Sequence, residues 1–180
     1  GITLFAGETF TQCPLTVDHA VLLDMIHNIK CGLITDGTAV GMGIANAVTR
    51  LKDSKAKSKV IILLTDGTNN KGDISPMTAA EIAKSFGIRV YTIGVGTNGM
   101  APYPYPVGNT VQYVSMPVEI DEKTLTEIAG TTDGNYFRAT SNSKLKEVYE
   151  EIDKLEKTKL NVKEYSKRDE EYHWFALAAF

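Results

Sequence analysis

The sequence predicts an α/β fold, in which a doubly wound, mostly parallel sheet has one antiparallel edge strand and helices on both faces. Three observations predict it. Short β-branched and aliphatic runs alternate along the chain with segments whose apolar residues recur at helical spacing. The run 59–64 is apolar without alternation after its first residue, Lys59, which is typical of a parallel strand buried on both faces. The length of 180 residues, with 43% apolar and 23% charged residues, fits one soluble globular domain.

The first predicted elements are a hairpin and a helix. Residues 2–5 predict a strand, and residues 9–13 can return antiparallel to it after a turn at residues 6–8. A helix is expected from about residue 17 to residue 30, because apolar residues gather on one of its faces. These residues are Leu22, Leu23, Ile26 and Ile29.

A second helix is predicted from about Thr38 to Leu51, because its apolar residues recur every three to four positions. Gly41 and Gly43 are poor helix formers in its first turns. Glycine at these positions indicates that the start of the helix must approach another backbone, or an ion, closely.

The rest of the chain alternates between strands and helices. Ser75 and Pro76 are typical of a helix start, and Gly87 is typical of a helix end. Asp121 is expected to cap a further helix. The remaining predicted elements are strands at 88–95 and 135–139 and a last helix from Ser143. A sheet of this class binds its ligand at the C-terminal ends of its strands.

Composition and failed motifs exclude several functions. The net charge of −3 argues against a basic nucleic-acid binder, and no run of about 18 apolar residues is present. Residues 94–99 match Gly-x-Gly-x-x-Gly, but the prolines that follow oppose the helix that a dinucleotide site requires. The loop from Asp66 fails as an EF-hand, because Lys71 and Met77 occupy its glycine and glutamate positions. The histidines His19, His27 and His173 are scattered singly.

Two oxygen-bearing side chains remain as a candidate metal site. Asp66 follows the most apolar strand, and Thr38 lies at a helix start after Asp36 and Gly37. A carboxylate and a hydroxyl on neighbouring loops suit a hard divalent ion such as Mg²⁺. The alternative is that Thr38 and Asp36 only cap a helix and that Asp66 only begins a turn.

These same segments carry a resemblance to a known family. Residues 63–67 (Leu-Leu-Thr-Asp-Gly) and 36–41 (Asp-Gly-Thr-Ala-Val-Gly) resemble the second and third metal-site segments of the von Willebrand factor A (vWA) domain. Strand and helix segments over most of the chain are similar to that fold. Residues 5–16, 100–104 and 152–172 resemble the bacterial Bat aerotolerance proteins BatA and BatB more closely.

The resemblance implies a metal-ion-dependent adhesion site (MIDAS). Thr38 would coordinate the ion through its hydroxyl, and Asp66 would bind it directly or through water. The ion would be Mg²⁺, with Mn²⁺ or Ca²⁺ as alternatives, and an Asp or Glu of a partner protein would complete its coordination. The family's first segment, Asp-x-Ser-x-Ser, has no counterpart in these residues. We therefore expect residues 1–157 to form a vWA domain that lacks its first strand and helix, with a gap in the sheet.

The C-terminal part of the chain changes in character. Residues 144–172 hold 17 of the 41 charges, and an apolar run follows His173. This pattern predicts a charged juxtamembrane tail at 158–173 and the start of a transmembrane segment at 174–180. The alternative is a tail that packs on the domain.

The predicted function is a membrane-anchored protein-interaction module that acts through its metal ion. The resemblance implies a bacterial stress-tolerance complex at the cytoplasmic membrane, with the domain on the periplasmic side. Neither catalysis nor nucleic-acid binding is predicted. Two alternatives remain, which are a metal-free structural scaffold within a membrane complex and a small-molecule enzyme that uses the crevice at the strand ends.

A second candidate surface is the loop from Thr97 to Val118, which holds four of the six prolines and three tyrosines. Residues 107–109 could turn a small hairpin. Tyr103, Tyr105 and Tyr113 are predicted to bind a partner protein, because tyrosine-rich surfaces are common in interfaces. The alternative is a rigid loop that covers the edge of the sheet.

The two cysteines, Cys13 and Cys31, could form a disulfide in an oxidising compartment. The sequence gives no distance between them, so two free thiols are the alternative.

Overall fold

The computed structural model describes residues 1–30, 32, 34–96, 99–107, 110–118 and 120–166. Cys31, and with it the predicted disulfide, lies outside this part of the chain, as do residues 167–180. The elements in chain order are β1 (Ile2–Phe5), β2 (Thr9–Cys13), α1 (His19–His27), α2 (Val40–Leu51), β3 (Lys59–Thr65), α3 (Pro76–Ser85), β4 (Ile88–Val95), β5 (Gly99–Val107), β6 (Thr110–Val118), α4 (Glu122–Thr131), β7 (Tyr136–Ala139) and α5 (Asn142–Ser166).

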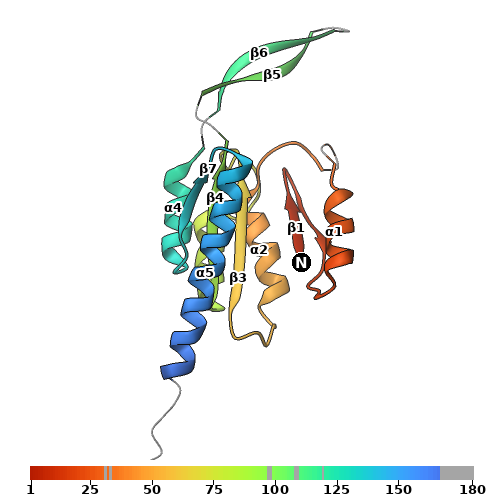
Figure 1. Ribbon diagram of the computed structural model, residues 1–180. Coiled ribbons are helices and arrows are strands. Elements are labelled where there is room, and N and C mark those ends of the chain that lie inside the picture. The colour runs from red at the N-terminus through yellow and green to blue at the C-terminus, as the bar shows by residue number, and fades with distance from the viewer. Residues whose placement is uncertain (31, 33, 97–98, 108–109, 119, 167–180) are drawn as a thin grey trace, which may run out of the picture.

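The centre of the fold is a parallel sheet in the order β3-β4-β7. Lys59 pairs with Ile88 and Thr65 with Gly94, so that β3 and β4 run in register over the whole of β3. Helices cover both faces of this sheet (Figure 1). The predicted α/β class, with a parallel sheet and helices on both faces, is therefore confirmed.

Alternation along β4 builds a separate core on each face of the sheet. Ile88 and Val90 pack with residues of α2, α3 and α4. Tyr91 and Ile93 pack on the other face with Val148 and Ile152 of α5. Both faces are buried because α2, α3 and α4 cover one face and α5 covers the other.

The antiparallel pair β1–β2 stands apart from this sheet. Ile2 pairs with Cys13 and Phe5 with Thr9, as predicted, but neither strand pairs with β3 in the described structure. A cavity of about 800 Å³ lies between the two sheets, lined mainly by apolar side chains of β1, α1, α2 and β3. The gap that was expected in the sheet is present at this position.

Helix α1 is shorter than predicted, and its apolar face is not buried. It begins at His19 and ends at His27, and none of its residues is buried. The face predicted to be apolar leaves Leu23, Ile26 and Ile29 exposed. The reason is that α1 lies against β2, where Gln12 donates to the Met25 carbonyl, and Ile26 and Ile29 border the cavity instead of a sheet.

The glycines in α2 lie where this helix comes very close to other parts of the chain, as the sequence predicted. A Cβ at Gly41 would lie 2.1 Å from the Ile74 carbonyl oxygen, and a Cβ at Gly43 would lie 2.9 Å from the Phe5 ring. Both distances are too short for a side chain. The glycines therefore allow α2 to pack directly on the segment before α3 and on β1.

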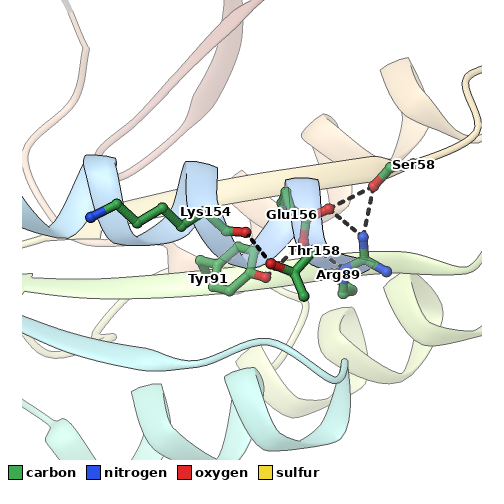
Figure 2. Close-up of polar contacts among 6 residues, drawn as sticks. All are labelled: Ser58, Arg89, Tyr91, Lys154, Glu156 and Thr158. Carbon is green, nitrogen blue, oxygen red and sulfur yellow. Dashed lines mark hydrogen bonds and ion pairs between the residues drawn. The ribbon is translucent and has the colours of Figure 1, made fainter. Parts of the chain in front are cut away.

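A polar cluster fastens α5 to the sheet (Figure 2). Arg89 Nε donates to Glu156 Oε1 at 2.8 Å, and its Nη2 forms an ion pair with Glu156 Oε2. Tyr91 Oη donates to Glu156 Oε1 at 2.7 Å, and Ser58 Oγ donates to Glu156 Oε2 at 2.8 Å. The carboxylate of Glu156 thus joins α5 to the start of β4 and to the residue before β3.

The surroundings of Glu156 change its acidity. Burial alone would raise the pKa of Glu156, but hydrogen bonds from Arg89, Tyr91 and Ser58 outweigh it and lower the pKa to about 2. Burial, together with the hydrogen bond to Glu156, raises the pKa of Tyr91 to about 12. The cluster is therefore held with Glu156 ionised and Tyr91 protonated over a wide range of pH.

We predict that Glu156→Gln lowers the free energy of unfolding at pH 7 by about 3 kcal/mol. This value follows from a drop in the pKa from 4.5 to about 2 at about 1.4 kcal/mol per unit. A lowered folded-state pKa stabilises above the unfolded value, so wild type should lose this stability as the pH falls from 4.5 towards 2. Urea unfolding across this range measures it. The exposed Glu150→Gln is the control, and an equal loss in both variants would contradict the role of Glu156.

Candidate metal centre

Asp66 lies at the C-terminal end of β3, where the chain turns out of the sheet. Thr65 is buried, and its hydroxyl both accepts from the Gly67 backbone N–H at 3.3 Å and donates to the Gly67 carbonyl at 3.2 Å. These contacts close the turn tightly. Asp66 consequently projects its carboxylate to the exposed side.

Thr38 is held beside this turn by Asn69 and Asn70, two asparagines that follow the turn in the sequence. The Thr38 backbone N–H donates to Asn70 Oδ1 at 2.8 Å, and the Thr38 carbonyl accepts from the Asn70 backbone N–H at 3.0 Å. The Val40 backbone N–H donates to Asn69 Oδ1 at 2.8 Å, so Asn69 satisfies a free donor at the start of α2. The loop after β3 thereby positions the residue that precedes α2.

The two predicted metal residues therefore border the same space. Thr38 and Asp66 both line the cavity between β1 and β3. A Cβ at Gly67 would lie 3.3 Å from Thr38 Oγ1, so glycine allows this hydroxyl to lie close to the turn after β3. Neither Thr38 Oγ1 nor the Asp66 carboxylate has a hydrogen-bond partner among the described residues.

The chemistry of these groups fits part of a site for a hard divalent ion. A half-buried hydroxyl and an exposed carboxylate supply oxygen ligands, which Mg²⁺ and Ca²⁺ prefer. The set is small, because the described part of the chain contains no cluster of three or more His, Cys, Asp or Glu residues that could hold a metal. The roles of Thr38 and Asp66 as ligands stay predictions.

Sequence reasoning missed Asn69 and Asn70. Their signal was present, since two asparagines directly follow Asp66-Gly67-Thr68. Their partners, however, lie about 30 residues earlier in the chain. Local patterns assign a helix cap to the residue before the helix, and here Ala39 makes no side-chain cap.

The second candidate surface is a hairpin rather than a loop. Strands β5 and β6 pair antiparallel from Gly99↔Val118 to Val107↔Thr110, so the hairpin predicted at residues 107–109 is present, although residues 108 and 109 lie outside the described structure. It rises clear of the rest of the chain (Figure 1). The predicted partner-binding tyrosines all lie on these strands: Tyr103, Tyr105 and Tyr113.

The register pairs none of these tyrosines with another tyrosine. Tyr113 pairs with Pro104, and Tyr103 pairs with Val114. Tyr113 is 72% exposed. Their binding role stays a prediction.

Comparison with known proteins identifies the domain. The pattern of the von Willebrand factor type A domain matches residues 1–151. The chain belongs to this family. It is also similar to BatB from Bacteroides thetaiotaomicron, with 32% identity and a TM-score of 0.70 over 86% of this chain and 78% of that one. The recognition of the vWA domain and of the likeness to Bat proteins is confirmed.

Two further structures bear on the site and its setting. An aerotolerance-related membrane protein from Bacteroides fragilis is 30% identical, with a TM-score of 0.68 over 84% of this vWA chain and 77% of that protein. Proximal thread matrix protein 1 from the mussel byssus, solved with zinc in its MIDAS motif, is 27% identical with a TM-score of 0.62 over 85% of this chain and 33% of that protein.

The vWA chain spans about half the length of the curated relatives it matches. It covers 53% of a protein from Borreliella burgdorferi at 24% identity and 49% of a UPF0353 protein from Nocardia farcinica at 30% identity. Among the described residues, no helix is both long and apolar enough to cross a bilayer. Helix α5 continues through residues 158–166 of the predicted charged tail, whereas residues 167–180 fall outside the described part.

We predict that Asn69→Ala destabilises the domain by about 1 kcal/mol, because the first turn of α2 loses a capping acceptor. Urea unfolding measures the loss. Thr68→Ala, an exposed neighbour for which the structure gives no hydrogen bond, is the matched control. Equal stability of the two variants would show that Asn69 does not hold α2.

Proposed function

We propose that this vWA domain is a metal-dependent protein-interaction module of a bacterial membrane-associated complex. The observation that carries this proposal is the placement of Thr38 and Asp66 on one cavity, with both oxygens free of protein partners in the described structure. Gly67 and the Asn69–Asn70 pair keep the two residues together. The site is thus organised by the fold before any ion binds.

Thr38 and Asp66 would hold the ion, and the loops around them would orient it. When bound, the ion supplies a positive charge with an open coordination position, which a carboxylate of a partner protein can fill. The MIDAS of the family that the chain resembles also includes an Asp-x-Ser-x-Ser segment, which would supply further oxygens and has no counterpart in residues 1–180. The zinc in the MIDAS motif of the mussel protein supports metal binding at the corresponding site of this fold.

The membrane setting is supported by the neighbouring structures. The Bacteroides fragilis relative is described as an aerotolerance-related membrane protein. The proposed location is therefore the bacterial cytoplasmic membrane, with this domain on the periplasmic side and a stress-tolerance complex as its partner. Catalysis forms no part of this proposal.

A metal-free scaffold is the second candidate. The observation that favours it is the small ligand set, since Asp66 is the one carboxylate among the described residues that line the cavity. A scaffold would keep the same fold and the same contacts between α2 and the loop after β3. The two candidates differ in their response to metal.

We predict that millimolar Mg²⁺ raises the melting temperature of this chain relative to chelator, because a ligand that binds only the folded state stabilises it. At ten times the dissociation constant, the gain is about 1.4 kcal/mol. Differential scanning calorimetry measures the shift. Thr38→Ala and Asp66→Asn should abolish it.

The control for this measurement is Asp73→Asn, which removes another exposed carboxylate of the same loop and should keep the shift. A melting temperature that does not respond to Mg²⁺, Mn²⁺ or Ca²⁺ would contradict metal binding by this chain and favour the scaffold.

A further inference from the structure

The β5–β6 hairpin has two outer edges of different character. Its nine cross-strand pairs run without a register shift from Gly99↔Val118 to Val107↔Thr110. In an antiparallel hairpin, alternate residues direct their backbone N–H and C=O groups towards the partner strand, and the others direct them outward. Each strand therefore has one set of residues on its outer edge.

Prolines mark the outer edge of β5. Pro102, Pro104 and Pro106 are spaced two residues apart, so their nitrogens all lie on the same side of the strand. Val107 and Thr110 are the pair nearest the turn, and in short hairpins such a pair forms ladder hydrogen bonds. Each of the three prolines is an odd number of residues away from Val107. Their backbone nitrogens therefore point to the outer side of the strand, away from β6. Because proline has no N–H, this edge cannot donate to another strand.

The same alternation leaves backbone groups on the outer edge of β6 without a partner strand in the described structure. The residues opposite the three prolines are Ser115, Tyr113 and Val111, and their N–H and C=O groups point outward. No described strand other than β5 pairs with β6. Pro117, the next outward position, ends this edge. The hairpin therefore offers a short edge of backbone donors and acceptors that is centred on Tyr113.

Charges do not protect this edge. Residues 90–118 contain no Asp, Glu, Lys or Arg, in a chain that is 23% charged overall. Exposed strand edges are commonly protected from pairing by charge, by proline or by a covering element. Strand β5 has the prolines, whereas β6 has exposed Tyr113 and Val114 at its centre.

We propose that β6 is a docking edge for a second copy of this chain. The two β6 strands would pair antiparallel about a two-fold axis at Tyr113, with Val111 of one copy opposite Ser115 of the other. Three outward residues per copy, each donating and accepting once, would form about six backbone hydrogen bonds. The product is a four-stranded sheet.

Charge and geometry favour a second copy as the occupant. A two-fold interface brings the same edge of both copies together, so a charged edge would repel itself, and this edge has no charge. The hairpin stands clear of the rest of the chain (Figure 1), which leaves room for two domains on opposite sides of the axis. Since both outer edges of the product are β5 edges closed by proline, assembly stops at the dimer.

Sedimentation velocity of the 180-residue chain over a range of concentrations, in chelator, tests this inference. The expected result is reversible dimerisation that does not depend on Mg²⁺, so this outcome is separable from the metal proposal. Tyr113→Pro removes the central outward N–H, and Tyr113→Lys places like charges at the axis. Each should weaken dimerisation by at least about tenfold.

Met100→Pro is the matched control, because it adds a proline to the outer edge of β5 and should leave the dimer unchanged. Circular dichroism and melting temperature show that each variant remains folded, and Tyr113→Lys keeps the test valid if the proline variant does not. A chain that stays monomeric up to about 1 mM, or a dimer that both Tyr113 variants leave intact, would overturn the inference. Pairing of β6 with a different protein in place of a second copy would overturn it as well.

Discussion

The contact between the loop after β3 and the start of α2 organises the functional end of this domain. Asn69 and Asn70 accept hydrogen bonds from the backbone of Val40 and Thr38. On its other side, the same segment before α2 is bonded to the turn after β1, since the Ala39 N–H donates to the Ala6 carbonyl at 2.7 Å. The residues that precede α2 therefore connect two strand units that share no ladder in the described structure.

This double attachment explains how the gap in the sheet is tolerated. The β1–β2 pair is joined to the body through the turn after β1 and through the packing of Phe5 against Gly43. Hydrogen bonds at one end and aromatic packing along the helix thus hold the pair without a continuous sheet. Thr38 lies within the segment that bears these contacts, so the candidate metal residue is tied to the junction between the two strand units.

Much of the fold could be predicted from the sequence, because its signals are local. The Ser75 cap, the Gly87 end and the apolar run of β3 each depend on neighbouring residues, and the structure has them where they were expected. The apolar face of α1 could be predicted from its periodicity, but its exposure could not, because whether an apolar face is covered depends on distant elements. The same limit applies to the site, where Thr38 and Asp66 could be named but the asparagines that hold Thr38 could not.

Glu156 also marks a mechanical boundary on α5. Up to this residue the helix packs on the sheet, whereas Lys157 and Thr158 are exposed and the helix continues beyond the sheet (Figure 1). A pulling force applied at the far end of α5 therefore reaches the domain first through the ion pair with Arg89. From Arg89 the load passes into β4, the central strand, which is bonded to a neighbour on each side. The helix can thus serve as a lever, with the Glu156 carboxylate as the polar anchor nearest to its far end.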